Sequence, residues 1–190
     1  MLQRNIVKLR YFEYEDIDLL MQLRSTNESY DFFYEYEPIN TQMQKNWWEN
    51  STSRSNEKNF IIESVTLNKA IGTAALVHID FRNRKCEFGR FMIEETLNTL
   101  GSAVEAELLA LEYAFDHLNM RKVYVEVFTE NKEVIRLHKQ FGFIQEAYFT
   151  EHIYKKGIYK DVMVLALQKS IFKEKSVKII KTLSRIKRSN

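Results

Sequence analysis

The chain has little of several residue types on which common classes of protein depend. Cys86 is the only cysteine, so an intrachain disulfide and a cysteine-ligated metal cluster are both excluded. No run of about 18 or more apolar residues occurs, which excludes a membrane-spanning helix. The first ten residues, MLQRNIVKLR, lack the apolar stretch of a secretory signal. We therefore expect a cytoplasmic protein in a reducing compartment, with Cys86 as a small buried hydrophobe.

Positive charge is also scarce outside the end of the chain. Residues 169–190 hold eight Lys or Arg against Glu174 alone, so the other 168 residues carry a net charge of −5 although the whole chain is at +2. A nucleic-acid-binding domain would spread positive charge over its working face, so we expect no nucleic-acid partner. An acidic body suits a cationic substrate such as an amine.

The 190 residues suffice for one domain with its own core. We assign residues 1–168 to that domain and residues 169–190 to a basic amphipathic helix or tail. Such a helix could lie on a membrane surface or an acidic partner, or it could pack on its own domain or on the second subunit of a homodimer. Few apolar residues support it, which favours packing; they are Phe172, Ile179, Ile180, Leu183 and Ile186.

Hydrophobic periodicity divides the domain into strands and helices. Alternation predicts strands over 5–11, 59–65, 69–80, 84–93, 122–128, 143–154 and 159–167. Helical spacing predicts helices over 15–25, 41–50, 101–118 and 131–140, with Thr41 as a cap and Gly142 as a stop. The strand–helix–strand unit at 84–128 requires a right-handed crossover to a parallel partner. We expect an α/β (α+β) fold with a mixed, mostly antiparallel seven-stranded sheet and helices on both faces.

Two segments could carry chemistry. Asn98-Thr99-Leu100-Gly101-Ser102-Ala103 opens a helix, where small side chains let the backbone approach a ligand and unpaired N–H groups favour a phosphate. The alternative is an ordinary helix start with Ser102 as its N-cap. The second segment contains Asn131, His138 and Gly142–Phe143. Asn131 could equally be an N-cap, and His138 could be a packed or solvated histidine in the last turn of a helix.

Taken together, these segments resemble the GNAT superfamily of acyl-CoA-dependent N-acetyltransferases. The family's acyl-CoA loop reads Q/R-x-x-G-x-G/A, which residues 98–103 match with Asn in the first place. Asn131, His138 and Gly142–Phe143 keep the spacing of its second motif. The resemblance covers about residues 5–167. It is closest to the branch that holds ribosomal-protein alanine, spermidine and nucleotide-amino-sugar acetyltransferases, as Leu23–Arg24 and Gly157–Asp161 also indicate.

The resemblance implies acetyl-CoA as cosubstrate and no metal. Strands 84–93 and 122–128, the fourth and fifth, would splay at one end to admit the pantetheine arm, with the Met92 N–H stabilising the oxyanion. Neutral residues replace the family's basic loop residues, so backbone N–H groups would carry phosphate recognition, and Glu105 and Glu107 would oppose a pyrophosphate if they faced it. The implied cofactor-binding residues are Phe91, Met92, Ile93, Asn98, Thr99, Leu100, Gly101, Ser102, Ala103, Asn131 and His138.

A carboxylate must accept a proton from an ammonium before the amine can attack. Glu87 stands where the family often has a glutamate, and strand alternation places it on one face with Gly89 and Phe91. The alternative for Glu87 is an ion pair with a neighbouring basic residue, and Glu126 is a weaker candidate base. His138 stands where many relatives have the tyrosine that is taken to protonate the departing thiolate.

Aromatic and polar residues are expected to form the acceptor pocket, although Phe33 and Trp47 could simply pack in the core. The assigned substrate residues are Tyr30, Phe33, Tyr34, Trp47, His78 and Glu87. The first functional hypothesis is acetyl transfer to a primary amine of a small molecule such as an amino sugar or a polyamine. The alternatives are a protein N-terminal acetyltransferase and a non-catalytic CoA-binding module, and the sequence leaves the acceptor open.

Overall fold

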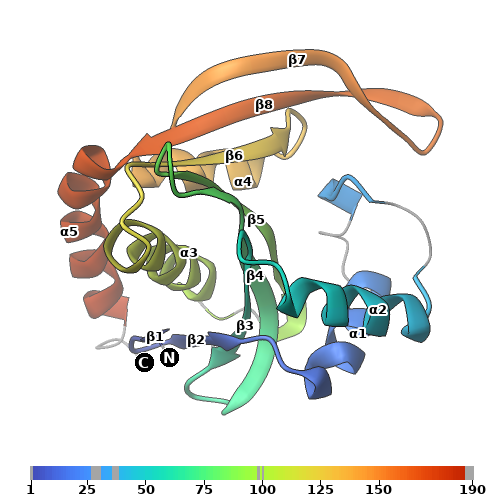
Figure 1. Ribbon diagram of the computed structural model, residues 1–190. Helices are drawn as coiled ribbons and strands as arrows, with labels where there is room; N and C mark the ends of the chain where they lie inside the picture. Colours follow the sequence, from blue (N-terminus) through green and yellow to red (C-terminus); the bar gives the residue numbers. More distant parts are fainter. Residues whose placement is uncertain (1, 27–30, 36–38, 98, 100, 187–190) are drawn as a thin grey trace.

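The computed structural model describes residues 2–26, 31–35, 39–97, 99 and 101–186. One sheet of eight strands organises the molecule, in the order β1-β2-β3-β4-β5-β6-β8-β7 (Figure 1). The strands are β1 Leu2–Gln3, β2 Val7–Tyr11, β3 Lys58–Ser64, β4 Lys69–Asp80, β5 Lys85–Ile93, β6 Lys122–Phe128, β7 Ile144–Lys155 and β8 Ile158–Gln168. The helices are α1 Ile17–Thr26, α2 Thr41–Thr52, α3 Ser102–Glu112, α4 Lys132–Phe141 and α5 Lys169–Ile186.

The sheet confirms the expected mixed α/β fold, because every neighbouring pair is antiparallel except β5 and β6. It has one strand more than the expected seven. The additional strand is β1, which pairs Leu2 with Leu9 of β2. A strand of two residues carries no periodicity that a sequence pattern could reveal.

Helices cover both faces of the sheet. Figure 1 shows α3 and α5 on one side of β4 and β5, with α1 and α2 on the other. Helix α3 is buried along nearly its whole length and continues into a π-helical turn at Tyr113–His117, which places Phe115 in the main core. Helix α5 joins the same core, where the ring centroid of Phe172 lies 5.0 Å from that of Phe115.

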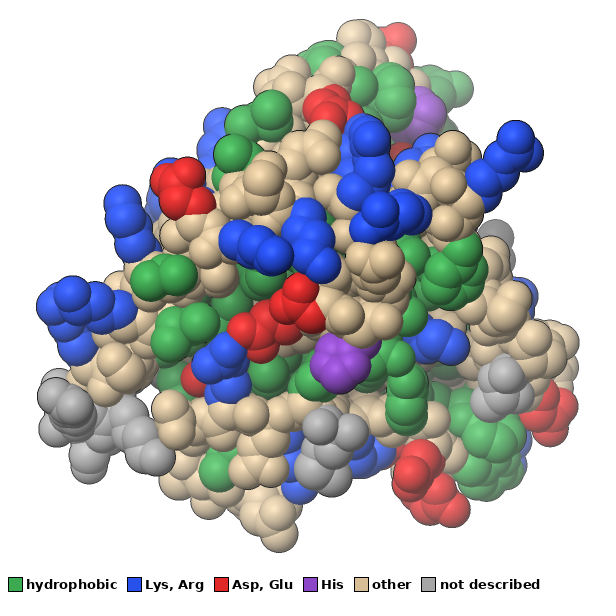
Figure 2. Space-filling model, turned by 60° about the vertical axis from the view of Figure 1, so that its left-hand side comes forward, with side chains coloured by type: hydrophobic (Ala, Val, Ile, Leu, Met, Phe, Trp, Pro, Cys, Tyr) green, Lys and Arg blue, Asp and Glu red, His purple; other side chains and the backbone are tan. Residues whose placement is uncertain are grey.

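The exposed side of α5 carries four of the six basic residues in this helix. Lys173, Lys178, Lys181 and Arg185 are exposed there, whereas Phe172 and Leu183 are buried. In Figure 2, which turns the left side of Figure 1 forward, Asp and Glu side chains lie among the Lys and Arg side chains. The apolar stripe of α5 is therefore occupied by the protein's own core.

Two helix ends illustrate how local chemistry sets the boundaries. Asn40, and not the expected Thr41, caps α2, because its Oδ1 accepts a hydrogen bond from the Met43 N–H at 2.9 Å and Thr41 is already helical. Gly142 ends α4 as expected, with φ of 94°. A Cβ at Gly142 would lie 2.7 Å from the Ile171 side chain, so both conformation and space favour glycine.

A bulge at Arg90 changes the side-chain alternation of β5. Arg90 has φ of 49°, and the β4–β5 register shifts between Ala75, opposite Gly89, and Thr73, opposite Met92. As a result Phe91 packs on Phe88, with ring centroids 5.3 Å apart, and lies against the main core. The expectation that Phe91 shares a face with Glu87 and Gly89 is wrong, because one extra residue reverses the alternation.

Strands β5 and β6 separate where the cavity described below begins. Their parallel pairing runs only from Lys85 with Lys122 to Glu87 with Tyr124, although β5 continues to Ile93 and β6 to Phe128. These are the fourth and fifth strands of the expected seven, so the predicted splay is confirmed.

Candidate functional site

A cavity of about 730 Å³ occupies the space between the separating strands. Its walls come from β4, β5, β6, α4, the start of α3 and the segment Asp31–Glu35. The predicted site residues that line it are Phe33, Tyr34, His78, Glu87, Phe91, Met92, Ile93, Ala103, Asn131 and His138. The fold thus brings the candidate base, the candidate acid and the end of β5 into one enclosure.

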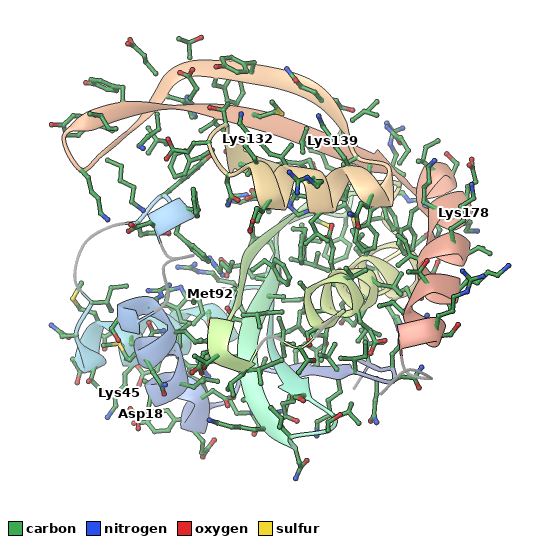
Figure 3. All side chains as sticks on the ribbon, turned by 180° about the vertical axis from the view of Figure 1, so that it is seen from behind. Asp18, Lys45, Met92, Lys132, Lys139 and Lys178 are labelled. Carbon is green, nitrogen blue, oxygen red and sulfur yellow. The ribbon has the colours of Figure 1, made fainter. Side chains whose placement is uncertain are left out.

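Several predicted residues do not line this cavity. Trp47 borders a second, much smaller cavity on the α1–α2 side, where the Arg90 guanidinium carbon lies 5.3 Å from its ring centroid. Among the described residues, Thr99, Gly101 and Ser102 also lie off the cavity lining. Tyr30, Asn98 and Leu100 lie outside the described residues. Figure 3 shows Met92 between the α1–α2 side and α4, and Met92 borders both cavities.

Glu87 and His78 form a hydrogen-bonded pair at the cavity wall. Oε2 of Glu87 lies 2.8 Å from Nδ1 of His78. His78 has φ of 49° and stands at a second register shift of β4, which turns its side chain toward Glu87. Burial raises the pKa of Glu87, the hydrogen bond from His78 lowers it, and the negative charge of Glu126 raises it further, with a net upward shift. An elevated carboxyl pKa suits a group that accepts a proton near neutral pH.

A second carboxylate, Glu126 of β6, faces the same cavity. Its Oε2 accepts a hydrogen bond from the Tyr34 hydroxyl at 2.9 Å. Burial and this bond raise the pKa of Tyr34, so its phenol stays protonated. Burial together with the charges of Glu87 and Glu126 raises the pKa of Tyr124 to about 12. Of the four glutamates that line the cavity, Glu87 and Glu126 therefore lie on adjacent strands, in a setting that disfavours additional negative charge.

His138 is paired with a glutamate that sequence reasoning did not assign to the site. Nδ1 of His138 lies 2.7 Å from Oε1 of Glu107 on α3, and the two residues are 3% and 0% exposed. The other oxygen, Oε2 of Glu107, is buried with no hydrogen-bond partner among the described residues. Because Nδ1 is occupied, Nε2 is the ring nitrogen left to serve the cavity that His138 lines. The only available signal was a glutamate within the apolar run of α3.

The start of α3 is built around Gly101, which is the N-cap in the left-handed conformation, with φ of 89° and ψ of −7°. Ser102 is the first helical residue and not the cap. It is fully buried, and its hydroxyl lies 2.6 Å from that of Thr99. Glu105 accepts hydrogen bonds from the backbone N–H groups of Ile6 and Val7 at 2.5 and 2.9 Å. The two acidic residues in the first half of this helix, Glu105 and Glu107, are thus engaged by protein groups.

Asn131 combines the two roles that the sequence left as alternatives. Its Oδ1 accepts a hydrogen bond from the Val134 N–H at 3.2 Å and caps α4, and the residue also lines the cavity. Over the described residues, no group of three or more His, Cys, Asp or Glu lies together as a metal site would require. Within that same part of the chain, none of the helices combines the length and apolar character needed to cross a bilayer.

Comparison with known proteins adds to this geometry. The family model described as "Acetyltransferase (GNAT) domain" matches residues 7–144. A spermidine N(1)-acetyltransferase of Vibrio cholerae is 27% identical over 169 residues, which cover 88% of this chain and 96% of that protein. The enzyme of the same name from Escherichia coli K12 is 27% identical over 85% of each chain.

Solved structures show the same fold. The crystal structure of spermidine N-acetyltransferase from Vibrio cholerae in complex with CoA and spermine matches with a TM-score of 0.82. The match has 24% sequence identity and covers 87% of this chain and 97% of that one. A structure of the spermidine/spermine N-acetyltransferase of the same organism in complex with manganese ions matches with a TM-score of 0.76 at 25% identity, over 90% of this chain and 97% of that one.

Proposed function

The chain belongs to the GNAT acetyltransferase family and is an acetyl-CoA-dependent N-acetyltransferase, and on that premise we propose that its acceptor is a small aliphatic polyamine. The observation that carries the proposal is the pair of carboxylates, Glu87 and Glu126, on adjacent strands of one cavity. Two negative charges side by side favour a ligand with more than one ammonium group. The names of the curated relatives, spermidine N(1)-acetyltransferases, support the same class of acceptor.

The parted strands fit the pantetheine arm of acetyl-CoA. Met92 directs its carbonyl at β4, because that oxygen would lie 2.2 Å from a Cβ placed on Gly72. The N–H and C=O groups of one strand residue point to the same side, and successive residues alternate. The Phe91 N–H is therefore directed away from β4, toward the gap. We assign it, in place of the Met92 N–H, the role of stabilising negative charge on the acetyl oxygen.

Bound acetyl-CoA supplies an acetyl group activated as a thioester. Gly101 would receive its phosphates through the N–H groups at the start of α3. Only about one amine in 10³ is unprotonated at neutral pH, so a base is needed. Glu87 accepts a proton from the substrate ammonium, directly or through a water molecule, and the free amine then attacks the thioester. Glu107 holds the His138 ring so that Nε2 can donate a proton to the departing thiolate.

Thiol release measured over a panel of amines tests this proposal. We expect spermidine and spermine to release CoA from acetyl-CoA with higher kcat/KM than glucosamine phosphate or an alanine-terminated peptide. A thermal shift with acetyl-CoA in the absence of any thiol release would identify a non-catalytic CoA-binding module. Preference for the peptide or the amino sugar would overturn the assignment of the acceptor while leaving the acetyl-transfer chemistry in place.

His78→Ala and Glu126→Gln should move the acid limb of the kcat/KM profile in opposite directions. Activity requires ionised Glu87, so the limb follows the pKa of Glu87 and lies at higher pH when that pKa rises. The hydrogen bond from His78 lowers the pKa, so removing it shifts the limb upward; the Glu126 charge raises the pKa, so removing it shifts the limb downward.

Initial rates between pH 5 and pH 9, at subsaturating amine, measure the acid limb of each variant. Glu130→Gln is the matched control, because its carboxylate pairs with Lys160 and Glu130 does not line the cavity among the described residues. Shifts of the same sign in H78A and E126Q would remove Glu87 from the role of base.

A further inference from the structure

The segment Asp31–Glu35, here called the strap, forms one wall of the cavity without belonging to the sheet. Four of its residues line the cavity: Phe32, Phe33, Tyr34 and Glu35. The Tyr34 hydroxyl donates to Glu126, and the Tyr34 ring packs on Phe128 with centroids 5.3 Å apart. A segment with so little regular structure depends on individual contacts for its position.

Lys155 supplies the most buried of these contacts. Its ammonium donates hydrogen bonds to the backbone carbonyls of Phe33 and, at 3.3 Å, Glu35, the two residues that flank Tyr34. Lys155 is only 2% exposed, and burial lowers its pKa. A lysine is almost never buried to this extent without partners, and the two carbonyls offset part of the cost of its burial.

The backbone of the β7–β8 hairpin fixes where Lys155 can reach. Lys155 is the last residue of β7, and the two turn residues that follow, Lys156 and Gly157, have φ of 50° and 85°. Positive φ at both positions is the type I′ arrangement that joins two strands tightly. The hairpin in Figure 1 extends past β6 toward the strap, so its tip and the strap meet although 120 or more residues separate them in sequence.

We infer that Lys155 is a positioning residue for the amine side of the reaction: its ammonium holds the strap so that Tyr34 and Glu126 shape the acceptor half of the cavity. The inference rests on the proposed function, since it assigns the strap to the acceptor and not to acetyl-CoA. The strap's hydrogen bonds to Glu126, Lys155 and Lys156 tie it to β6 and the β7–β8 hairpin, whereas the phosphates would bind at the start of α3. Loss of Lys155 should therefore weaken amine binding selectively.

The neighbouring residue provides a matched control. Lys156 also reaches the strap, through an ion pair with Asp31 at 2.5 Å, but both side chains of that pair are 61% exposed. Exposed pairs contribute little, whereas a buried charge that donates to two carbonyls is costly to remove. The variants Lys155→Met and Lys156→Met differ in this respect while each removes one positive charge from the same turn.

Two readouts test the inference. Limited chymotrypsin digestion of the ligand-free protein should cleave after Phe32, Phe33 or Tyr34 at least about tenfold faster in K155M than in K156M or the wild type, because buried charge-assisted bonds of this kind resist local opening. Steady-state kinetics should show KM for spermidine raised about tenfold or more in K155M, with KM for acetyl-CoA unchanged. The Lys155→Arg variant keeps the charge and the donors, so its digestion rate and its KM for spermidine should lie between those of K155M and the wild type.

The possible outcomes distinguish failure of the inference about Lys155 from failure of the proposed polyamine acceptor. Equal digestion rates and equal KM for spermidine in K155M and K156M would overturn the inference about Lys155. Absence of thiol release from the wild type with any polyamine would instead overturn the proposed acceptor, and the digestion experiment would still report on the strap. If K155M does not fold, Lys155→Gln replaces it; loss of folding in both variants would make Lys155 a structural residue and would overturn the inference.

Discussion

Replacing Glu87 with glutamine lowers kcat/KM for the amine by about 100- to 1,000-fold, because general-base catalysis by a positioned carboxylate contributes in this range. The substitution keeps the size of the side chain and the ability of its oxygen to accept a bond from His78, so the fold should not change. The loss should appear mainly in kcat and should be largest near neutral pH, where Glu87 is ionised and spermidine is still protonated. Thiol release at saturating acetyl-CoA, followed over a range of spermidine concentrations, measures it.

Glu146→Gln serves as the comparison for this experiment. Glu146 lies on the outer strand β7 and pairs with Lys122 of β6. The Glu146 side chain is 37% exposed, so the E146Q variant should keep the wild-type kcat/KM. An amine that is already unprotonated needs no base. A primary amine of low pKa, which is largely unprotonated near neutral pH, should therefore recover much of the activity lost in E87Q. Wild-type rates in E87Q, with spermidine at neutral pH, would eliminate Glu87 as the proton acceptor and direct attention to Glu126.

Replacing Glu107 with leucine should lower the free energy of unfolding by about 3 kcal/mol, because it leaves His138 buried beside an apolar side chain with no partner for Nδ1. The figure lies at the low end of the range for broken buried ion pairs, since imidazole has a neutral form and guanidinium does not. Urea denaturation followed by far-UV circular dichroism, with the slope of the transition compared between proteins, measures the change.

Glu112→Leu tests whether burial is the cause. Glu112 lies on the same helix and pairs with Arg4, but the two side chains are 24% and 28% exposed. Loss of that pair should cost only about 0–1 kcal/mol. Equal destabilisation by E107L and E112L would mean that the Glu107–His138 pair adds nothing beyond an ordinary surface interaction.

Much of the fold could be predicted from periodicity alone. Strands β4 and β6 were predicted with the observed bounds, and α4 ends at the glycine that the pattern identified. These elements are long or clearly alternating, so local sequence and final packing agree. The short strand β1 and the cap at Asn40 were missed, because the first depends on a partner strand and the second on a difference of one residue.

The site was predicted less completely for a related reason. The loop and helix motifs are local in sequence, so they drew attention to Gly101, Asn131 and His138. Glu107 contacts His138, which lies 31 residues away in the sequence, and Lys155 contacts Phe33, which lies more than 100 residues away. No local sequence pattern predicts either contact. Trp47 was assigned to the acceptor pocket on its residue type, whereas the structure places it beside the smaller cavity.

Arg90, the extra residue in β5, is held by hydrogen bonds to both its main chain and its side chain. The Thr73 hydroxyl donates to the Arg90 carbonyl at 2.9 Å, and the Arg90 guanidinium bonds Glu57 and Asn59 at 2.7 and 2.8 Å. Upstream of this point Glu87 lines the cavity, and downstream Phe91 packs on Phe88 and the main core. A single-residue insertion or deletion here would exchange the surfaces on which Phe91 and Met92 lie, so β5 should tolerate substitutions far better than changes in length.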